Sequence, residues 1–162
     1  MTLLQVVNAA MAFCLAAYGI QAFILTLLYL RHRCDDPAPA DMAGRAWPTV
    51  AVQLPIFNER HVVARLIDAA ASLDYPADRL EVQVLDDSTD DTTALAEARA
   101  AHHRARGVNV RVIHRTERSG FKAGALAAGL TETTAEFLAV FDADFAPQPD
   151  FLRQVIPYFV DQ

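Results

Sequence analysis

Two carboxylates separated by one small residue, Asp142 and Asp144, follow a short apolar run at 137–141. The run has the length and aromatic content of a buried strand. Side chains two residues apart in an extended segment point to the same side, so we expect both carboxylates to face one crevice. Two acids this close repel each other unless a cation lies between them. A hard divalent ion such as Mg²⁺ or Mn²⁺, itself holding a diphosphate, meets that need.

Acidic side chains also follow two other predicted strands. Glu59 comes after the apolar segment 49–54, and Asp86 and Asp87 come directly after the segment 81–85. The carboxyl ends of parallel strands meet at one edge of an open α/β sheet, where ligands bind. A carboxylate at that edge can accept the imide N–H of a nucleobase or the hydroxyls of a ribose.

Lys122 opens a helix of small residues that we predict at 121–130, after a third strand at 108–114. A lysine beside the amino end of a helix can hold phosphate oxygens. A metal bound by the acidic pair can neutralise a diphosphate as it leaves. The residue types and their places therefore predict a site for a nucleoside diphosphate.

Strands and helices alternate through this part of the chain. Apolar residues recur at three- and four-residue spacing in 62–73, and an Ala-rich helix is expected to end near Arg104. Such alternation implies parallel βαβ units, so we predict an α/β domain with a mostly parallel sheet and flanking helices. Pro55 is expected to end the first strand, and Asn58 to cap the helix that follows.

The amino-terminal segment has a different character. No charged side chain precedes Arg31, and the stretch 9–30 is dense in apolar residues. A helix of that length can span the hydrocarbon core of a bilayer. A cleaved signal peptide needs a basic start and a shorter apolar run, and neither is present. A buried globular helix is the remaining alternative to a transmembrane helix.

The charges after this segment indicate its orientation. Arg31, His32 and Arg33 follow it at once, and the positive-inside rule then places the rest of the chain in the cytoplasm. We expect a transmembrane anchor at 1–33 in the inner or plasma membrane. A proline-rich linker at 34–48 and a nucleotide-binding part at 49–162 follow it.

The net charge and the cysteine content exclude some classes of partner and site. The formal net charge is −6, from 20 acidic against 14 basic residues. A nucleic-acid surface requires a basic face, so we expect no nucleic-acid partner. The two cysteines, Cys14 and Cys34, form no disulfide framework and no metal-ligand cluster.

Four blocks that carry these residues resemble the family 2 glycosyltransferases, and most of all their membrane-bound processive branch of cellulose-synthase-like and mannan-synthase-like enzymes. The blocks are Val-Gln-Leu-Pro-Ile-Phe-Asn-Glu-Arg at 52–60, Val-Leu-Asp-Asp-Ser-Thr-Asp-Asp-Thr at 84–92, Ser-Gly-Phe-Lys-Ala-Gly-Ala-Leu at 119–126, and 141–152. Four blocks in the right order are specific, whereas a single Asp-x-Asp is weak.

The resemblance implies a GT-A (Rossmann-like) nucleotide-sugar fold. It also implies metal-dependent, inverting transfer of a hexose to a growing β-glycan or a lipid acceptor, from a donor of the UDP-glucose or GDP-mannose class. Carried over by position, the donor-binding residues are Glu59, Asp86, Asp87, Lys122 and Asp142. Asp86 and Asp87, helped by Glu59, would bind the base and ribose, and Asp142 and Asp144 would hold Mg²⁺ or Mn²⁺ and the diphosphate.

Enzymes of this branch also have a second half, with an acceptor-side carboxylate as general base, a Gln-x-x-Arg-Trp-type motif and further membrane helices. The sequence ends at Gln162 without them. We therefore expect an incomplete domain, a general base beyond Gln162, and a chain that binds the donor but transfers sugar poorly or not at all. A membrane-tethered, catalytically inactive nucleotide-sugar-binding or interaction fragment is the alternative.

Two other classes are compatible with parts of the pattern. Asp86, Ser88, Asp90 and Glu97 fall at positions one, three, five and twelve of an EF-hand calcium loop, although the sixth position, which needs Gly, is Asp91. A phosphatase would use the first acid of the Asp-x-Asp pair as its nucleophile. Such sites usually continue to Thr or Val, and Phe145 stands there.

Overall fold

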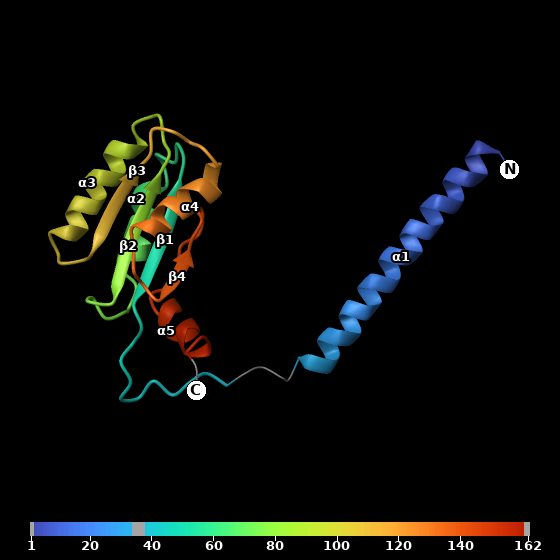
Figure 1. Ribbon diagram of the computed structural model, residues 1–162, viewed down its shortest axis with the longest axis horizontal. Helices are drawn as coiled ribbons and strands as arrows, with labels where there is room; N and C mark the ends of the chain where they lie inside the picture. The colour runs from blue at the N-terminus through green and yellow to red at the C-terminus, as the bar shows by residue number, and fades with distance from the viewer. Residues whose placement is uncertain (1, 34–37, 161–162) are drawn as a thin grey trace. The chain divides into compact units, whose positions relative to one another are not determined.

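The computed structural model describes residues 2–33 and 38–160, in two compact units divided at Pro39 (Figure 1). The first unit is the helix α1 (Leu3–His32). The helix has 30 residues and is long and apolar enough to cross a membrane by length and composition. Cys34 and the start of the predicted linker lie outside the described residues, and residues 38–49 contain no helix or strand.

The second unit is built on a parallel sheet of four strands in the order β3-β2-β1-β4. These strands are β1 (Val50–Ile56), β2 (Leu80–Asp86), β3 (Val110–His114) and β4 (Phe137–Val140). The register pairs Ile56 with Asp86 and Asp86 with His114, so β1, β2 and β3 end level with one another. The predicted parallel α/β architecture is present.

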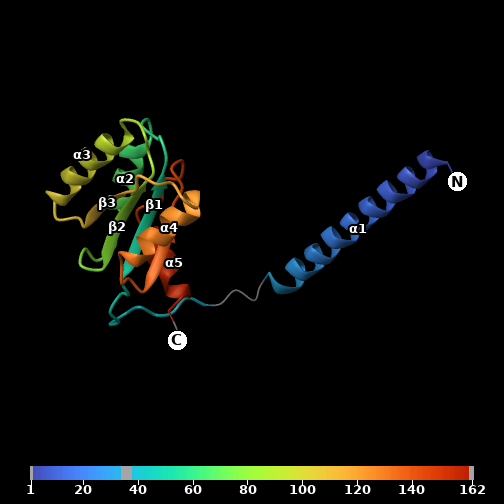
Figure 2. The ribbon, with the colours of Figure 1, turned by 45° about the horizontal axis from the view of Figure 1, so that its top comes forward.

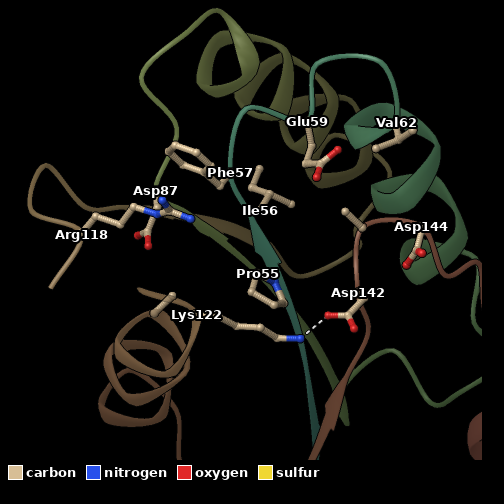
Figure 3. A pocket seen from close by; sticks show the side chains of 12 residues that line it. Pro55, Ile56, Phe57, Glu59, Val62, Asp87, Arg118, Lys122, Asp142 and Asp144 are labelled. Carbon is tan, nitrogen blue, oxygen red and sulfur yellow. Dashed lines mark hydrogen bonds and ion pairs between the residues drawn. The ribbon is translucent and has the colours of Figure 1, made fainter. Parts of the chain in front are cut away.

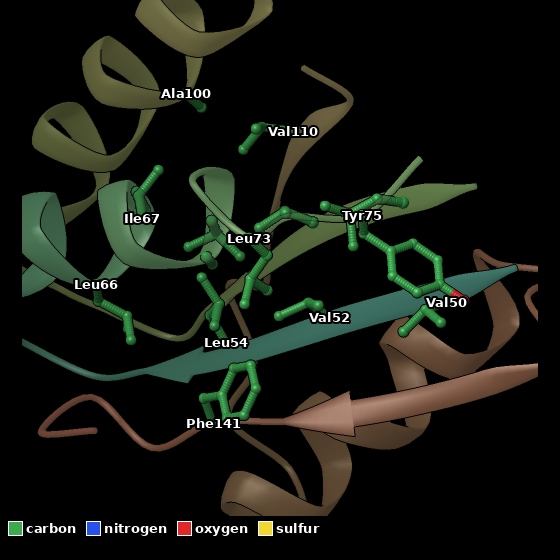
Figure 4. Close-up of a cluster of buried hydrophobic side chains, with 14 of the residues drawn as sticks. Val50, Val52, Leu54, Leu66, Ile67, Leu73, Tyr75, Ala100, Val110 and Phe141 are labelled. Atoms are coloured by element: carbon green, nitrogen blue, oxygen red, sulfur yellow. The ribbon is translucent and has the colours of Figure 1, made fainter. Parts of the chain in front are cut away.

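Helices cover both faces of the sheet (Figures 1 and 2). On one face lie α2 (Val63–Ala71) and α3 (Thr92–Arg104). There the alternate strand residues Val52, Leu54 and Val84 are fully buried against helix residues that include Leu66 and Ile67 (Figure 4). Near β4, a short helix α5 (Phe151–Val155) and a 3₁₀ turn (Ile156–Tyr158) add Leu152 and Ile156 to the same core.

The opposite face carries α4 (Phe121–Thr131), which sits very close to the strands. A Cβ atom at Gly129 would lie 2.6 Å from Nε2 of Gln53 and 2.7 Å from Leu85. Beneath the helix, that Gln53 nitrogen donates a 3.0 Å hydrogen bond to Gln83, so the two buried amides satisfy each other. The small residues of this segment therefore serve close packing on the sheet.

Two local expectations are wrong. The strand β1 runs through Pro55 to Ile56. The backbone N–H and C=O groups of the odd-numbered residues of β1, which include Pro55, point toward β4. Because β4 pairs with β1 only as far as Gln53, the N–H that Pro55 lacks would have no partner in the sheet. Asn58 does not cap α2, whose N-cap is Val62.

Gly124 in α4 allows the loop before this helix to approach it. A Cβ atom there would lie 2.0 Å from the backbone oxygen of Ser119 and 2.9 Å from Nη1 of Arg115. We expect Gly124→Ala to destabilise the domain by about 1–3 kcal/mol through overpacking. This cost exceeds the gain in helix propensity, which is at most about 1 kcal/mol.

Urea unfolding followed by the fluorescence of Trp47 measures this change. Trp47 is the only tryptophan, and its ring packs edge-on against Tyr75 at a centroid distance of 5.5 Å. The control is Ala123→Ser, which adds one atom at the exposed neighbouring position. Equal midpoints for Gly124→Ala and the wild type would show that the loop does not pack as described.

Candidate functional site

A pocket of about 450 Å³ opens at the carboxyl edge of the sheet, between the ends of β1 and β4 (Figure 3). The strand order reverses at this point, because β2 and β3 lie on one side of β1 and β4 lies on the other. Ligands of open α/β sheets bind at such a switch point. Five of the predicted site residues line this pocket, and they are Glu59, Asp87, Lys122, Asp142 and Asp144.

The two acids at the end of β4 reach the pocket by a turn. The strand ends at Val140, and the N–H of Phe145 donates a 3.0 Å hydrogen bond to the backbone oxygen of Asp142. The expectation of an extended segment through Asp142 and Asp144 is therefore wrong. Both side chains are exposed and line the pocket nonetheless.

Lys122 lies in the first turn of α4 and crosses the pocket toward the acidic pair (Figure 3). Its ammonium forms an ion pair with Oδ1 of Asp142. More than half of each side chain is exposed, so solvent screens this pair strongly. The two residues therefore balance each other's charge without being fixed in place.

The carboxylate of Asp87 lines the pocket and is paired with Arg115, which lies outside the lining. Nε and Nη2 of Arg115 donate to its two oxygens at 2.8 and 2.6 Å, and both side chains are largely buried. These hydrogen bonds raise the pKa of Arg115. Arg115 also donates to the backbone oxygens of Ser119 and Phe121 at 3.3 and 3.2 Å, so it ties the end of β2 to the loop before α4.

Asp86 is placed differently from its neighbour, because its side chain is fully buried and does not line the pocket. Its oxygens accept hydrogen bonds from the N–H of Ser88 at 2.9 Å and the hydroxyl of Thr93 at 2.5 Å, and one lies 2.9 Å from Nδ1 of His114. Burial alone raises the pKa of Asp86, but these hydrogen bonds outweigh it and lower the pKa. The carboxylate thus supports the loop that carries Asp87.

Sequence reasoning missed two pocket residues, Arg118 and Phe57. The guanidinium of Arg118 lies 3.5 Å from the centroid of the Phe57 ring and 5.2 Å from that of Phe121. Stacked in this way, Arg118 and Phe57 form a flat, cationic wall opposite the acidic pair (Figure 3). The only sequence signal was a basic residue in the polar loop shortly before Lys122.

Asn58 joins the loops that follow β1 and β2. Its backbone is in the left-handed region, with φ of 55°. Its N–H donates to Oγ of Ser88 at 2.9 Å, and its Oδ1 accepts the N–H of Thr89 at 2.9 Å. Asn tolerates this backbone conformation better than most residues. These two hydrogen bonds fix Phe57 and Glu59 on one loop relative to Asp87 on the other.

Substitutions at Asn58 separate the backbone contribution from that of the side chain. Asn58→Gly removes the amide and leaves the left-handed conformation freely available, whereas Asn58→Ala removes the amide and keeps the Cβ that makes this conformation costly. We expect Asn58→Gly to lower the free energy of unfolding by about 1 kcal/mol, the worth of one hydrogen bond. Asn58→Ala should lower it by about 1 kcal/mol more. Urea unfolding measures both, and identical losses for Gly and Ala would contradict the conformational part.

The calcium-loop alternative does not fit this geometry. Asp86, its first supposed ligand, is the last residue of β2 and is already hydrogen-bonded. Within residues 2–33 and 38–160, no group of three or more His, Cys, Asp or Glu side chains is arranged to hold a metal ion. Asp142 and Asp144 are thus two exposed carboxylates on the pocket, fewer than such a group would contain.

Comparisons with known proteins agree with this geometry. The sequence model of the family described as glycosyl transferase family 2 matches residues 51–162. Glucomannan 4-beta-mannosyltransferase 1 of Oryza sativa subsp. japonica is 46% identical over 140 residues, which are 80% of this chain and 26% of that protein. Glucomannan 4-beta-mannosyltransferase 2 of Arabidopsis thaliana is 44% identical, over 74% of this chain and 23% of that protein. The chain thus spans about a quarter of the length of these relatives.

Solved structures show the same fold. The mannosyltransferase PcManGT from Pyrobaculum calidifontis, in complex with GDP-Man and Mn²⁺, has a TM-score of 0.77 and 31% identity, over 94% of this chain and 44% of that one. S. aureus TarS 1-349, in complex with UDP-GlcNAc, has a TM-score of 0.58 and 25% identity, over 67% of this chain and 30% of that one. The predicted GT-A-type fold is confirmed.

Proposed function

Because the chain belongs to glycosyl transferase family 2, we propose that its pocket binds a nucleotide-diphosphate sugar together with Mn²⁺ or Mg²⁺. The observation that carries this proposal is the convergence of three separate strand ends and one helix start on one pocket. Glu59 follows β1, Asp87 follows β2, Asp142 and Asp144 follow β4, and Lys122 lies in the first turn of α4. Acids and a lysine gathered at a switch point suit a diphosphate with its cation.

The charges divide the pocket into two ends. We place the ribose and the base at one end, with the carboxylates of Asp87 and Glu59 as acceptors for their hydroxyl and N–H groups. Arg118, stacked on Phe57, offers a flat face on which a base can lie. At the other end, Lys122 lies with the two acids, and we place the diphosphate there.

Asp142 and Asp144 fit a divalent cation, because both are exposed carboxylates on one pocket and Mg²⁺ and Mn²⁺ prefer oxygen ligands. When bound, the cation supplies electrostatic stabilisation to the diphosphate as it leaves. The chain's own contribution is to orient the donor between the ribose end and the phosphate end, and to present the ammonium of Lys122 to the phosphate oxygens.

The relatives support a choice of donor within this proposal. Glucomannan mannosyltransferases and a mannosyltransferase bound to GDP-Man favour GDP-mannose over UDP-glucose. We propose that the whole enzyme transfers mannose to a growing β-glycan with inversion, from the cytoplasmic side of a membrane in which α1 is the anchor. This reaction is proposed for the whole protein, since the chain spans about a quarter of its relatives.

Titration of the full chain in detergent with GDP, GDP-mannose, UDP and UDP-glucose, each with and without Mn²⁺, tests the proposal. We expect binding that requires Mn²⁺ and that is tighter for the guanosine ligands. Asp144→Ala removes one of two protein ligands to the cation, and the affinity for GDP with Mn²⁺ should fall at least about tenfold. Isothermal titration calorimetry measures each constant.

The matched control is Asp78→Ala. Asp78 is an exposed acid just before the start of β2, at the opposite edge of the sheet. GDP affinity that ignored both Mn²⁺ and Asp144→Ala would show that the assignment of the phosphate end is wrong. Absence of any nucleotide binding would instead favour a membrane-tethered interaction module.

A further inference from the structure

The ion pair between Lys122 and Asp142 joins two groups to which the proposed function gives different partners. The ammonium is to hold phosphate oxygens, and the carboxylate is to hold a cation. In the structure they hold each other across the pocket, with Nζ of Lys122 against Oδ1 of Asp142 (Figure 3). One oxygen of Asp142 therefore has to lose its ammonium before it can ligate a metal.

The charge balance of the pocket favours such an arrangement. Its lining has the acids Glu59, Asp87, Asp142 and Asp144 and the bases Arg118 and Lys122. Arg115 neutralises Asp87 from outside the lining, which leaves an excess of acid. A diphosphate is repelled by this excess unless a cation enters with it.

Lys122 is suited to a change of partner. Of the 14 lysine and arginine residues, only Lys122 is a lysine. Lysine is a compact charge on a flexible stem, whereas arginine favours fixed bidentate pairs, such as the pair that Arg115 makes with Asp87. The pair with Asp142 is exposed, and exposed pairs are weak, so breaking it costs little.

The position of Lys122 on α4 also favours an anionic partner. It lies in the first turn of an 11-residue helix, where the helix dipole disfavours an isolated cation and attracts anions. The ammonium is therefore stabilised by whichever anion is nearest. Asp142 is that anion in the structure, and a diphosphate placed in the pocket would be a second.

We infer that Lys122 is an exchangeable counter-ion, which pairs with Asp142 until a divalent cation takes this carboxylate and then pairs with the diphosphate of the donor. The inference rests on the proposed function. It makes the metal and the lysine competitors for Asp142 when no nucleotide is bound, and cooperating partners when one is. No covalent bond changes in this exchange.

The competition for Asp142 predicts that one substitution at Lys122 changes the affinities for Mn²⁺ and for GDP in opposite directions. Lys122→Met keeps the length of the stem and removes the charge. We expect it to raise the affinity for Mn²⁺ without nucleotide by roughly two- to fivefold, the range for loss of a weak exposed ion pair. The same substitution should lower the affinity for GDP at saturating Mn²⁺ at least about tenfold, because a charge-assisted hydrogen bond to phosphate is lost. Calorimetry on the full chain measures both constants.

Two variants control this experiment. Arg118→Met removes the other cation of the pocket, which stacks on Phe57 and does not pair with Asp142. It should raise Mn²⁺ affinity clearly less than Lys122→Met does. Lys122→Arg restores the charge, and its Mn²⁺ affinity should return toward that of the wild type. An equal gain for Arg118→Met and Lys122→Met would mean that the overall field of the pocket is responsible, and the exchange would be refuted.

A direct readout uses the single lysine. Labelling with [¹³Cε]lysine gives one lysine side-chain NMR signal, that of Lys122. We expect this signal to move when Mg²⁺ is added alone, and to move again when GDP follows. A signal unmoved by Mg²⁺, with Mn²⁺ affinity unchanged in Lys122→Met, would overturn the exchange while Mg²⁺-dependent GDP binding still stood. Failure of the proposed function has a different signature, because the wild type would then bind no GDP at all.

Discussion

The pairing of β4 with β1, rather than with β3, is the constraint on which the site depends. This pairing reverses the strand order beside β1, and the pocket opens at the carboxyl ends of β1 and β4. The register places Gln53 opposite Val140, so the turn that carries Asp142 emerges beside Pro55 at the floor of the pocket. Asp142 and Asp144 thereby reach the pocket that Glu59 and Asp87 also line.

Gathering acids at one edge creates repulsion, and the fold neutralises each of them in a different way. Asp86 is buried and satisfied by hydrogen bonds. Asp87 has a fixed bidentate partner in Arg115. Asp142 has only an exposed and weak partner in Lys122. Asp87, which is firmly paired, lies at the proposed ribose end, and the exposed Asp142 and Asp144 lie where a cation is proposed to bind.

Much of the fold was predictable from local sequence patterns. The strand predicted at 137–141 is observed at 137–140, and the small-residue helix predicted at 121–130 is observed at 121–131. The order of the elements also follows from apolar runs and spacing, and the pocket lies at the predicted edge of the sheet. These features depend on residues that are near one another in the chain. The long apolar helix α1 was predicted for the same reason, and it lies within the predicted segment 1–33.

What the sequence did not predict depends on distant contacts. Asp86 and Asp87 are adjacent acids, and only the partners of Asp86, which include His114 on β3, show that it lies under the pocket and Asp87 lies in it. Asn is a common residue at helix N-caps, but Asn58 instead forms hydrogen bonds with a loop 30 residues away in the sequence. Arg118 and Phe57 lie on two different loops, so no periodic pattern in the sequence predicts that they stack.

The central claim is that separate strand ends share one cation-dependent pocket. Paramagnetic broadening of backbone amide NMR signals by Mn²⁺, added with GDP to the ¹⁵N-labelled chain, tests it most directly. The account predicts simultaneous broadening in three segments, 57–59, 86–88 and 142–145, with the signal of Asp78 at the opposite edge left sharp. Broadening confined to a single one of these segments, or centred near Asp78, would contradict it.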